Sequence, residues 1–297
     1  MQVGLSLPQF GPTATREHVL RCAQAADAAG FDSLWAADHV VVPREFRSPY
    51  PYAADGINST IYPPDVMLEA LSLLTFVAGA TERIRLGTSV LVLPMRQPVL
   101  LAKVLATLDH LSGGRLTLGV GVGWCEEEFE VLDLPYDRRG RRTDEALQLL
   151  RAFWSQDWVD FEGEFYRVDG WTCRPRPAGP IPFWFGGDTR PQMERTVRFG
   201  DGWMAAPRSP LEKTLRDRER LREIAERAGR DPASITVHAG GAGFLVPGEL
   251  GRLAEELHRL AEAGVEHTTV RADPEHIDRT PELIAQFGAE HLPALKA

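Results

Sequence analysis

Asp38 and His39 stand side by side at the end of the stretch FDSLWAADH. Histidine titrates near neutral pH and can give or take the proton that accompanies a hydride transfer. A neighbouring carboxylate would orient the imidazole or raise its pKa. The pair predicts acid–base chemistry, and a hydrogen-bonded structural pair is the alternative interpretation.

Three glycines, Gly119, Gly121 and Gly123, recur at every second position of the stretch GGRLTLGVGVGW. Because side chains alternate along a strand, we expect all three positions to face the same side. The missing side chains would leave room for a flat ring, or would let the sheet curve and pack closely. The spacing alone leaves both interpretations open. It also differs from the GxGxxG fingerprint of dinucleotide-binding folds.

The composition bounds the class of protein. The chain has 297 residues, with 43% hydrophobic and 25% charged, as in ordinary soluble globular proteins. Its net charge of −9 argues against nonspecific nucleic-acid binding. The longest apolar run, residues 86–95, is far shorter than the roughly 20 residues of a membrane-spanning helix. Three widely separated cysteines and no leading signal peptide favour a cytoplasmic protein.

Eight strand-like runs alternate with helical runs along the chain. Strands are expected at residues 2–10, 31–39, 83–94, 115–124, 182–187, 202–205, 235–239 and 267–271. Helices are expected at residues 15–29, 65–81, 98–112, 141–155, 191–199, 211–228, 249–263 and 280–292.

This repeated order predicts parallel strands and, at this length, a closed (β/α)8 TIM barrel that forms one domain over residues 1–297. The alternative is an open, doubly wound sheet, but the first turn lacks the phosphate-binding glycines that such a sheet would use. The stretch WVDFEGEFYRVDG interrupts the alternation and predicts a β-hairpin over residues 158–174. This hairpin lies in an insertion of about residues 156–180.

The strand ends, where TIM barrels place their active sites, offer few acids or nucleophiles. Only Asp38–His39 and Arg271–Asp273 place a carboxylate close to another strong polar group. No HxH or HExxH metal motif and no GxSxG serine motif occurs in the sequence. The reactive group is therefore expected to be a bound cofactor, and no metal site is expected.

The stretches LGTSVLVLP, LDHLSGGRLTLGVGVGW and PFWFGGDTRPQMERTVRFGDGW resemble the bacterial luciferase-like monooxygenase superfamily. Within it, the chain looks most like oxidoreductases that use the deazaflavin coenzyme F420. The resemblance covers essentially the whole chain. It implies a TIM barrel that holds an isoalloxazine or deazaflavin ring at its C-terminal mouth.

The resemblance also implies roles for particular residues. Ser89–Val90 matches a bulge that often carries a non-proline cis peptide and backs the ring. A plain strand with a trans peptide is the alternative interpretation. Asp38–His39 matches a pair in which the histidine lies near the reactive face of the ring. Gly121, Gly123 and Trp124 are also predicted to contact the cofactor. For Trp124, stacking in the substrate pocket and roofing of the core are the alternative interpretations.

The sequence Gly186-Gly187-Asp188-Thr189, followed by a helix, matches the phosphate region of the family. Glycines permit close backbone approach, and a helix N-terminus favours an anion. Asp188 opposes phosphate contact unless it points away from the site. An ordinary capped turn is the alternative interpretation.

Two positions depart from the sugar-phosphate dehydrogenases of the superfamily. Those enzymes carry a glutamate where this chain has Trp124, and a tryptophan soon after the Asp–His pair, where this chain has residues 40–43. Sugar-phosphate oxidation is therefore not expected. The acids Glu126, Glu127 and Glu128 lie nearby, but acids that open a helix more often satisfy its dipole.

The loop at residues 40–64 is long and carries Phe46, Tyr50, Tyr52 and Tyr62. Long barrel loops often act as lids, so these aromatics are candidates for lining a nonpolar substrate site.

The sequence thus favours hydride transfer between F420 and a small organic substrate, with His39 as proton partner. The alternatives are an FMN-dependent monooxygenase that uses reduced FMN and oxygen, and a flavin-binding protein without turnover. A homodimer is common in the superfamily.

Overall fold

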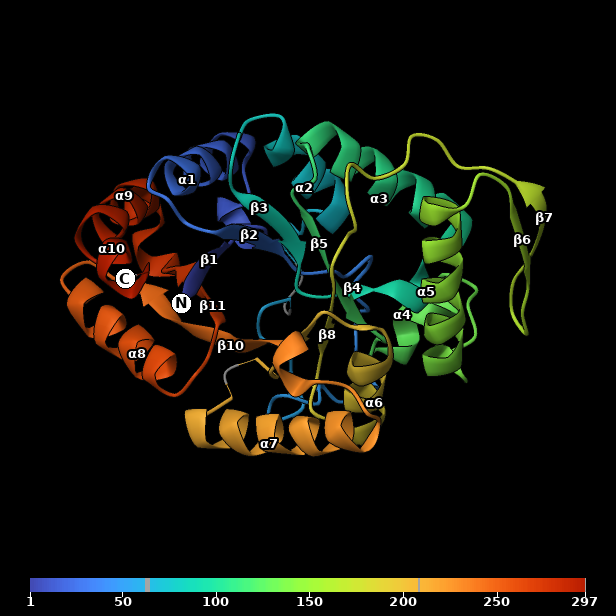
Figure 1. Ribbon diagram of the computed structural model, residues 1–297. Helices are drawn as coiled ribbons and strands as arrows, with labels where there is room; N and C mark the ends of the chain where they lie inside the picture. Colours follow the sequence, from blue (N-terminus) through green and yellow to red (C-terminus); the bar gives the residue numbers. More distant parts are fainter. Residues whose placement is uncertain (62–64, 208, 297) are drawn as a thin grey trace.

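The chain folds into a closed barrel of eight parallel strands surrounded by helices (Figure 1). The computed structural model describes residues 1–61, 65–207 and 209–296. Neighbouring strands pair in the order β3-β2-β1-β11-β10-β9-β8-β5, and pairing between β3 and β5 closes the ring. The barrel strands are β1 (Gln2–Ser6), β2 (Ser33–Ala36), β3 (Arg85–Thr88), β5 (Leu116–Gly121), β8 (Phe183–Gly186), β9 (Gly202–Met204), β10 (Thr236–Leu245) and β11 (His267–Ala272). The predicted TIM barrel is confirmed, and the open doubly wound sheet was the wrong alternative.

Helices cover the outside of the barrel, and two of them begin or end at residues that commonly cap helices. The first helix follows Thr15, whose hydroxyl accepts a hydrogen bond from the His18 N–H at 3.2 Å. The third begins at Pro98 and ends at Gly113, which adopts a left-handed φ of 72°. The helices are α1 (Arg16–Ala28), α2 (Ala70–Ala78), α3 (Pro98–Ser112), α4 (Glu126–Val131), α5 (Arg139–Ser155), α6 (Arg190–Phe199), α7 (Leu211–Arg227), α8 (Leu250–Glu262), α9 (Thr280–Glu290) and α10 (Leu292–Lys296). In the described part of the chain, no helix has both the length and the apolar character needed to cross a membrane.

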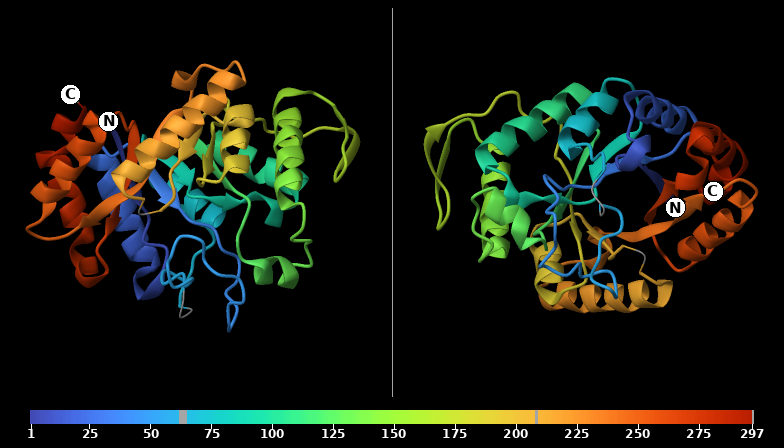
Figure 2. Two further views of the ribbon diagram at one scale, coloured as in Figure 1. Left: turned by 90° about the horizontal axis from the view of Figure 1, so that it is seen from below. Right: turned by 180° about the vertical axis from the view of Figure 1, so that it is seen from behind.

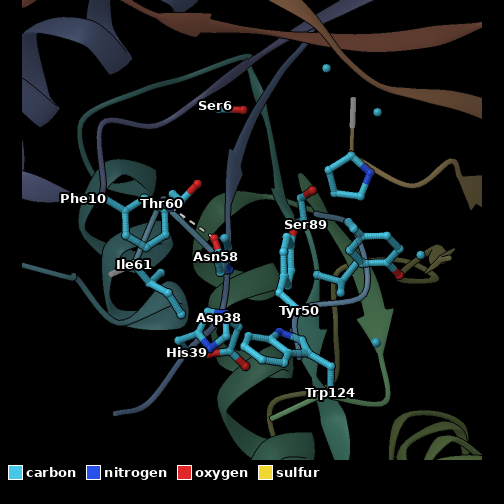
Figure 3. A pocket seen from close by; sticks show the side chains of 18 of the residues that line it. Ser6, Phe10, Asp38, His39, Tyr50, Asn58, Thr60, Ile61, Ser89 and Trp124 are labelled. Atoms are coloured by element: carbon cyan, nitrogen blue, oxygen red, sulfur yellow. Dashed lines mark hydrogen bonds between the residues drawn. The ribbon is translucent and has the colours of Figure 1, made fainter. Parts of the chain in front are cut away.

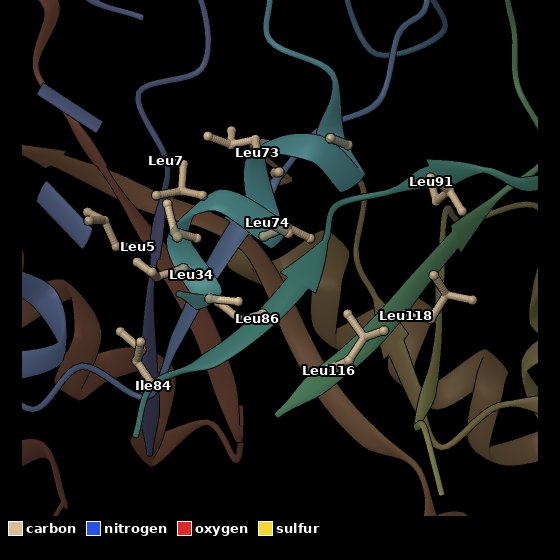
Figure 4. Close-up of a cluster of buried hydrophobic side chains, with 14 of the residues drawn as sticks. Leu5, Leu7, Leu34, Leu73, Leu74, Ile84, Leu86, Leu91, Leu116 and Leu118 are labelled. Carbon is tan, nitrogen blue, oxygen red and sulfur yellow. The ribbon is translucent and has the colours of Figure 1, made fainter. Parts of the chain in front are cut away.

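The main hydrophobic core lies between the strands and the surrounding helices. Leucines from several strands point outward and pack against leucines of α2 in the close-up of Figure 4. Burying one such side chain contributes about 1.5–3 kcal/mol to folding. The labelled members of this cluster are Leu5, Leu7, Leu34, Leu73, Leu74, Ile84, Leu86, Leu91, Leu116 and Leu118. This hydrophobic cluster holds the strands against the helices. The opposite faces of the strands point into the barrel interior.

The barrel interior is aromatic and polar. Trp35 donates a hydrogen bond from Nε1 to Ser33 Oγ at 2.8 Å, and Ser33 Oγ lies 2.8 Å from His267 Nε2. Trp35 also stacks on Trp184, with ring centroids 5.3 Å apart. A Cβ atom at Gly4 would lie 2.5 Å from Ser33 Oγ, so this glycine makes room for the cluster. The interior is therefore packed, and space for a ligand lies above it.

A two-stranded hairpin extends away from the barrel, as Figures 1 and 2 show. Its strands β6 (Val159–Glu162) and β7 (Arg167–Trp171) pair antiparallel. Within the turn, the N–H groups of Phe165 and Tyr166 donate to the carboxylate of Glu145 on α5. The hairpin predicted within residues 158–174 is confirmed.

Several expected boundaries differ from the structure, and two of them lie close to the barrel mouth. The helix predicted over residues 65–81 begins only at Ala70, because Met67 forms a bridge with Phe10 and the Gln9 side chain donates to Leu68 O at 2.7 Å. Glu69 then caps the helix by accepting from the Ser72 N–H at 2.7 Å. The strand predicted over residues 83–94 is interrupted after β3 and resumes as the short β4 (Leu91–Val92), which pairs with β5.

Candidate functional site

A cavity of about 1270 Å³ opens at the C-terminal ends of the barrel strands. Figure 2 shows the loop between β2 and α2, in blue to cyan, at the same end of the barrel. All the site residues predicted from the sequence line this cavity, although they come from separate strands and loops. They are Asp38, His39, Ser89, Val90, Gly121, Gly123, Trp124, Gly186, Gly187, Asp188 and Thr189. The structure thus brings them together, and their roles stay predictions.

His39 pairs with a carboxylate that is distant in sequence. Its Nδ1 lies 2.7 Å from Glu128 Oε2, and the Glu128 side chain is 1% exposed. The other oxygen, Glu128 Oε1, accepts a hydrogen bond from the Val40 N–H at 2.8 Å. The expectation that Asp38 would orient His39 was therefore wrong, because Glu128 of α4 fills that position.

Asp38 is instead a buried structural carboxylate. Its Oδ2 accepts from the Val92 N–H at 2.9 Å, and its Oδ1 lies 2.5 Å from the Arg96 guanidinium. Burial raises the pKa of Asp38, and the charge of Arg96 opposes that shift. Arg96 also lies 3.2 Å from Glu69. These contacts join the end of β2 to the segment after β4 and leave no free carboxylate oxygen beside His39.

The peptide bond between Ser89 and Val90 is cis, as the resemblance implies. It lies between β3 and β4, and the Ser89 N–H donates to Ala36 O at 2.7 Å. Ser89 is exposed at the cavity and Val90 is half-buried. This segment therefore presents a small hydroxyl and an apolar side chain at the edge of the cavity.

The space beside the three glycines is filled by the protein itself. A Cβ at Gly119 would lie 1.8 Å from the carbonyl oxygen of Thr88, and one at Gly121 would lie 2.5 Å from Val90 Cγ2. Gly123 has a left-handed φ of 81°, and its Cβ would lie 2.8 Å from Phe129. Gly123 also follows the end of β5, so the three positions do not face one side of a strand. The packing interpretation is correct, and any room for a ring comes from the cavity above.

The turn after β8 presents a hydroxyl at the N-terminus of α6. Gly187 has a φ of 114°, a conformation that favours glycine. Thr189 is exposed, and its side chain makes no capping hydrogen bond. Asp188 pairs with Lys213 on α7, which in turn pairs with Asp217. Lys213 therefore neutralises the carboxylate that opposed an anion at this turn.

Arg139 lies at the start of α5 and also lines the cavity. Its guanidinium carbon sits 3.7 Å from the centroid of the Tyr136 ring, and its Nε donates to Gly123 O at 3.1 Å. Within the described ranges it has no ion pair with a carboxylate, so its charge remains available to a ligand. Arg139 could not be predicted from the sequence, because nothing in its local pattern separates it from Arg138 and Arg141.

The loop that follows β2 is docked onto the cavity mouth through aromatic contacts. Figure 3 shows His39, Tyr50 and Trp124 gathered at one side of the cavity. The Trp124 ring stacks on Phe46 at 5.5 Å between centroids and meets the Tyr50 ring edge-on at 5.2 Å. Tyr52 also lines the cavity, whereas Tyr62 lies outside the described residues.

The acids of α4 hold the same loop. Glu127 Oε1 accepts hydrogen bonds from the N–H groups of Arg47 and Ser48. Burial raises the pKa of Glu127, but hydrogen bonds from the Ser48 side chain and from backbone N–H groups outweigh burial and lower the pKa to about 2. The expectation that the acids mainly satisfy the helix dipole was therefore incomplete. Their position directly after Trp124 was the signal that could have identified them.

The floor of the cavity includes a second histidine, His238, which is 2% exposed. It stacks on His267 at 4.9 Å between ring centroids. Burial lowers the pKa of His238 to about 3, so its imidazole is neutral at physiological pH. His39 is therefore the histidine at this site that has a charged partner.

Comparison with known proteins places this architecture in a family. The family model for luciferase-like monooxygenases matches residues 1–286. An F420-dependent glucose-6-phosphate dehydrogenase of Nakamurella multipartita is 33% identical over 229 residues, which cover 76% of this chain and 61% of that protein. An FMNH2-dependent dimethylsulfone monooxygenase of Pseudomonas fluorescens is 28% identical over 272 residues, covering 90% of this chain and 66% of that protein.

The fold has a close counterpart among solved structures. An F420-dependent secondary alcohol dehydrogenase, in complex with an F420–acetone adduct, superposes with a TM-score of 0.78. The two chains share 21% sequence identity, and the match covers 100% of this chain and 99% of the other. At this identity the likeness concerns the fold, while the family model spans nearly the whole sequence. The chain belongs to the luciferase-like monooxygenase family.

Proposed function

We propose that this protein is an oxidoreductase that transfers hydride between coenzyme F420 and a small, uncharged organic substrate. The observation that carries the proposal is the position of His39. Its imidazole lines a large cavity at the C-terminal end of the barrel, and a buried carboxylate holds one ring nitrogen. An acid–base group beside a cofactor-sized space is what hydride transfer to a carbonyl, or from an alcohol, requires.

The residues around the cavity fit a deazaflavin. Ser89 and Val90 offer an edge against which a flat ring can rest, and the aromatic side chain of Trp124 lies across the mouth. The free hydroxyl of Thr189 at the N-terminus of α6 suits a phosphate, as does the unpaired charge of Arg139. Lys213 removes the repulsion that Asp188 would otherwise exert. When bound, the coenzyme supplies a two-electron hydride carrier.

His39 then acts on the proton that accompanies the hydride. As an alcohol carbon loses hydride, the imidazole accepts the hydroxyl proton. In the reverse direction, the protonated imidazole gives that proton to the carbonyl oxygen. Glu128 stabilises the charge on the ring in either direction.

The cavity walls favour an uncharged substrate. Phe10, Tyr50, Ile61 and Trp124 present apolar and aromatic surface, on two sides of the view in Figure 3. Besides Arg139, the cations Arg47 and Arg271 line the cavity. Arg47 is paired with Glu130, and Arg271 also interacts with other groups of the protein. A sugar phosphate, the substrate named for the Nakamurella relative, would need a second anion site beyond the one assigned to the coenzyme.

The second candidate is an FMN-dependent monooxygenase, because the Pseudomonas relative that uses FMNH2 matches 90% of this chain. Turnover measurements separate the candidates. Reduced F420 or reduced FMN is mixed with the enzyme and a panel of ketones, aldehydes and aromatic substrates, with and without oxygen. The proposal expects oxygen-independent oxidation of reduced F420. Product formation only with reduced FMN and oxygen would establish the monooxygenase, and cofactor binding without turnover would indicate a flavin-binding protein.

A further inference from the structure

Glu128 is placed to control His39 and the loop above it at the same time. Its side chain is buried at the first turn of α4, and its carboxylate accepts three hydrogen bonds. Oε2 receives one from His39 Nδ1 at 2.7 Å, and Oε1 receives two from the Val40 and Val41 N–H groups at 2.8 and 3.4 Å. Both oxygens are therefore engaged by one short segment, residues 39–41.

These contacts determine which nitrogen of His39 carries the proton. An ionised carboxylate can only accept hydrogen bonds, so Nδ1 must be the donor. In a neutral imidazole, Nε2 then has a lone pair and no proton. No described residue forms a hydrogen bond to Nε2, and His39 lines the cavity. The free nitrogen is therefore the one that can accept a proton from a ligand.

We propose that Glu128 is a positioning residue that fixes neutral His39 as the Nδ1–H tautomer and makes this tautomer depend on docking of the loop. The tautomer and its coupling stand on the contacts of Glu128. Only their consequence for catalysis rests on the proposed function.

The coupling follows from the shared carboxylate. The loop of residues 40–61 starts at the two N–H groups that Glu128 holds, and its next part is held by Glu127 and by the rings packed on Trp124. If the start of the loop leaves α4, the same movement takes His39 away from Glu128. Closure of the loop and orientation of the imidazole are then one event, so the proton acceptor forms only when the cavity is covered.

Glu127 provides a matched control. It lies on the same turn of α4, is largely buried and holds the same loop, but its carboxylate contacts Arg47 and Ser48 rather than His39. In Glu128→Gln, the amide oxygen stays with the Val40 N–H and the amide NH2 faces His39 Nδ1. Neutral His39 must then move its proton to Nε2. Glu127→Gln weakens the hold on residues 47 and 48 only. Residues 39–41 stay bound to Glu128, so the hydrogen bond between Glu128 and His39 is left in place.

The test is NMR of the full chain with ¹⁵N-labelled histidine, in which the His39 signals are assigned by their loss in His39→Asn. We expect neutral His39 to be the Nδ1–H tautomer in the native protein and in Glu127→Gln. In Glu128→Gln, at least half of the population is expected to shift to Nε2–H. A native Nε2–H tautomer, or an unchanged tautomer in folded Glu128→Gln, would overturn the proposal. The native measurement decides the matter even if Glu128→Gln does not fold.

Kinetics then tests the catalytic consequence. Glu128→Gln is expected to lower kcat by about 100-fold and to change the Kd of F420 by less than about twofold, because general acid–base catalysis contributes at least this much. Glu127→Gln is expected to raise KM more than it lowers kcat. Equal kcat values for the two variants would contradict the positioning role. If F420 does not bind at all, the proposed function fails while the NMR result still tests Glu128.

Discussion

The rim and the floor of the cavity each present a histidine, and the two imidazoles differ in burial and in their hydrogen-bond partners. His39 at the rim pairs with the buried carboxylate of Glu128 at 2.7 Å and lines the cavity. His238 at the floor is 2% exposed, and neither of its ring nitrogens has a hydrogen-bond partner in the described part of the chain. Burial without a partner holds the pKa of His238 near 3.

Burial in the barrel interior keeps His238 uncharged, whereas the carboxylate opposite His39 gives that imidazole a fixed hydrogen-bond partner. Desolvation disfavours the charged imidazole, and a nearby negative charge favours it. The rim supplies that charge from α4, a short helix that the alternation of strands and helices did not predict. The contacts of the histidine at the rim therefore depend on loops and short helices. The histidine at the floor is held by close packing in the barrel interior.

The largest effect is expected from removing the rim histidine. His39→Asn should lower kcat by about 10²–10³-fold, because the proton donor and acceptor is lost. The Kd of F420 should change by less than about threefold. Steady-state kinetics and equilibrium titration measure the two quantities. His258→Asn, at an exposed site on α8, is the control, and equal losses in both variants would remove the catalytic role of His39.

Packing around β5 predicts the next effect. Gly119→Ala should lower the free energy of unfolding by about 2–3 kcal/mol, because its Cβ meets the Thr88 carbonyl oxygen at 1.8 Å. Urea denaturation measures this change. Gly251→Ala on α8 has no atom within 4 Å of its Cβ and should stabilise the protein by about 0.5–1 kcal/mol. If Gly119→Ala leaves the free energy of unfolding unchanged, there is space beside β5 that a ligand could use.

Burial of His238 should make the free energy of unfolding depend on pH. The pKa of His238 is about 3 in the folded protein and 6.5 as its ordinary value. Between these values the unfolded chain binds the extra proton, so stability falls as pH falls. As the pH falls, the free energy of unfolding of the native protein should decrease by up to about 1.4 kcal/mol per pH unit more than that of the His238→Phe variant. Urea denaturation from pH 6.5 down to about 4.5 measures this decrease. Parallel plots of unfolding free energy against pH for the two proteins would contradict the prediction.

The smallest effect concerns the anion site at α6. Thr189→Val should weaken F420 binding by about tenfold, which is the loss of one hydrogen bond to a charged group. The affinity for a deazaflavin fragment without the phosphate should stay the same. Fluorescence titration with both ligands measures the difference. An equal loss for both ligands would show that Thr189 does not contact the phosphate.

The sequence was sufficient for the barrel and for those residues of the cavity lining that stand at strand ends, because both follow from local patterns. The alternation of apolar runs and helix signals such as Thr15 and Gly113 places each strand end at one mouth. Asp38, His39 and Thr189 were then found at strand ends. The hairpin was equally local, since its two strands alternate around a short turn.

The pairing between distant side chains could not be read from the sequence. His39 and Glu128 are 89 positions apart, and adjacency in the chain suggested Asp38 as the partner instead. Neighbouring residues in an extended segment tend to point to opposite sides, so Asp38 turns toward Arg96 while His39 turns toward α4. Glycine spacing in β5 was equally ambiguous, because a missing side chain makes room for the protein as readily as for a ligand.

We propose that the cavity binds a deazaflavin, and equilibrium titration of the purified protein is the decisive test. Oxidised F420 and FMN are titrated separately under the same conditions. We expect F420 to bind at least about tenfold more tightly than FMN, which is a difference of about 1.4 kcal/mol in binding free energy. Tight binding of FMN without measurable binding of F420 would contradict it.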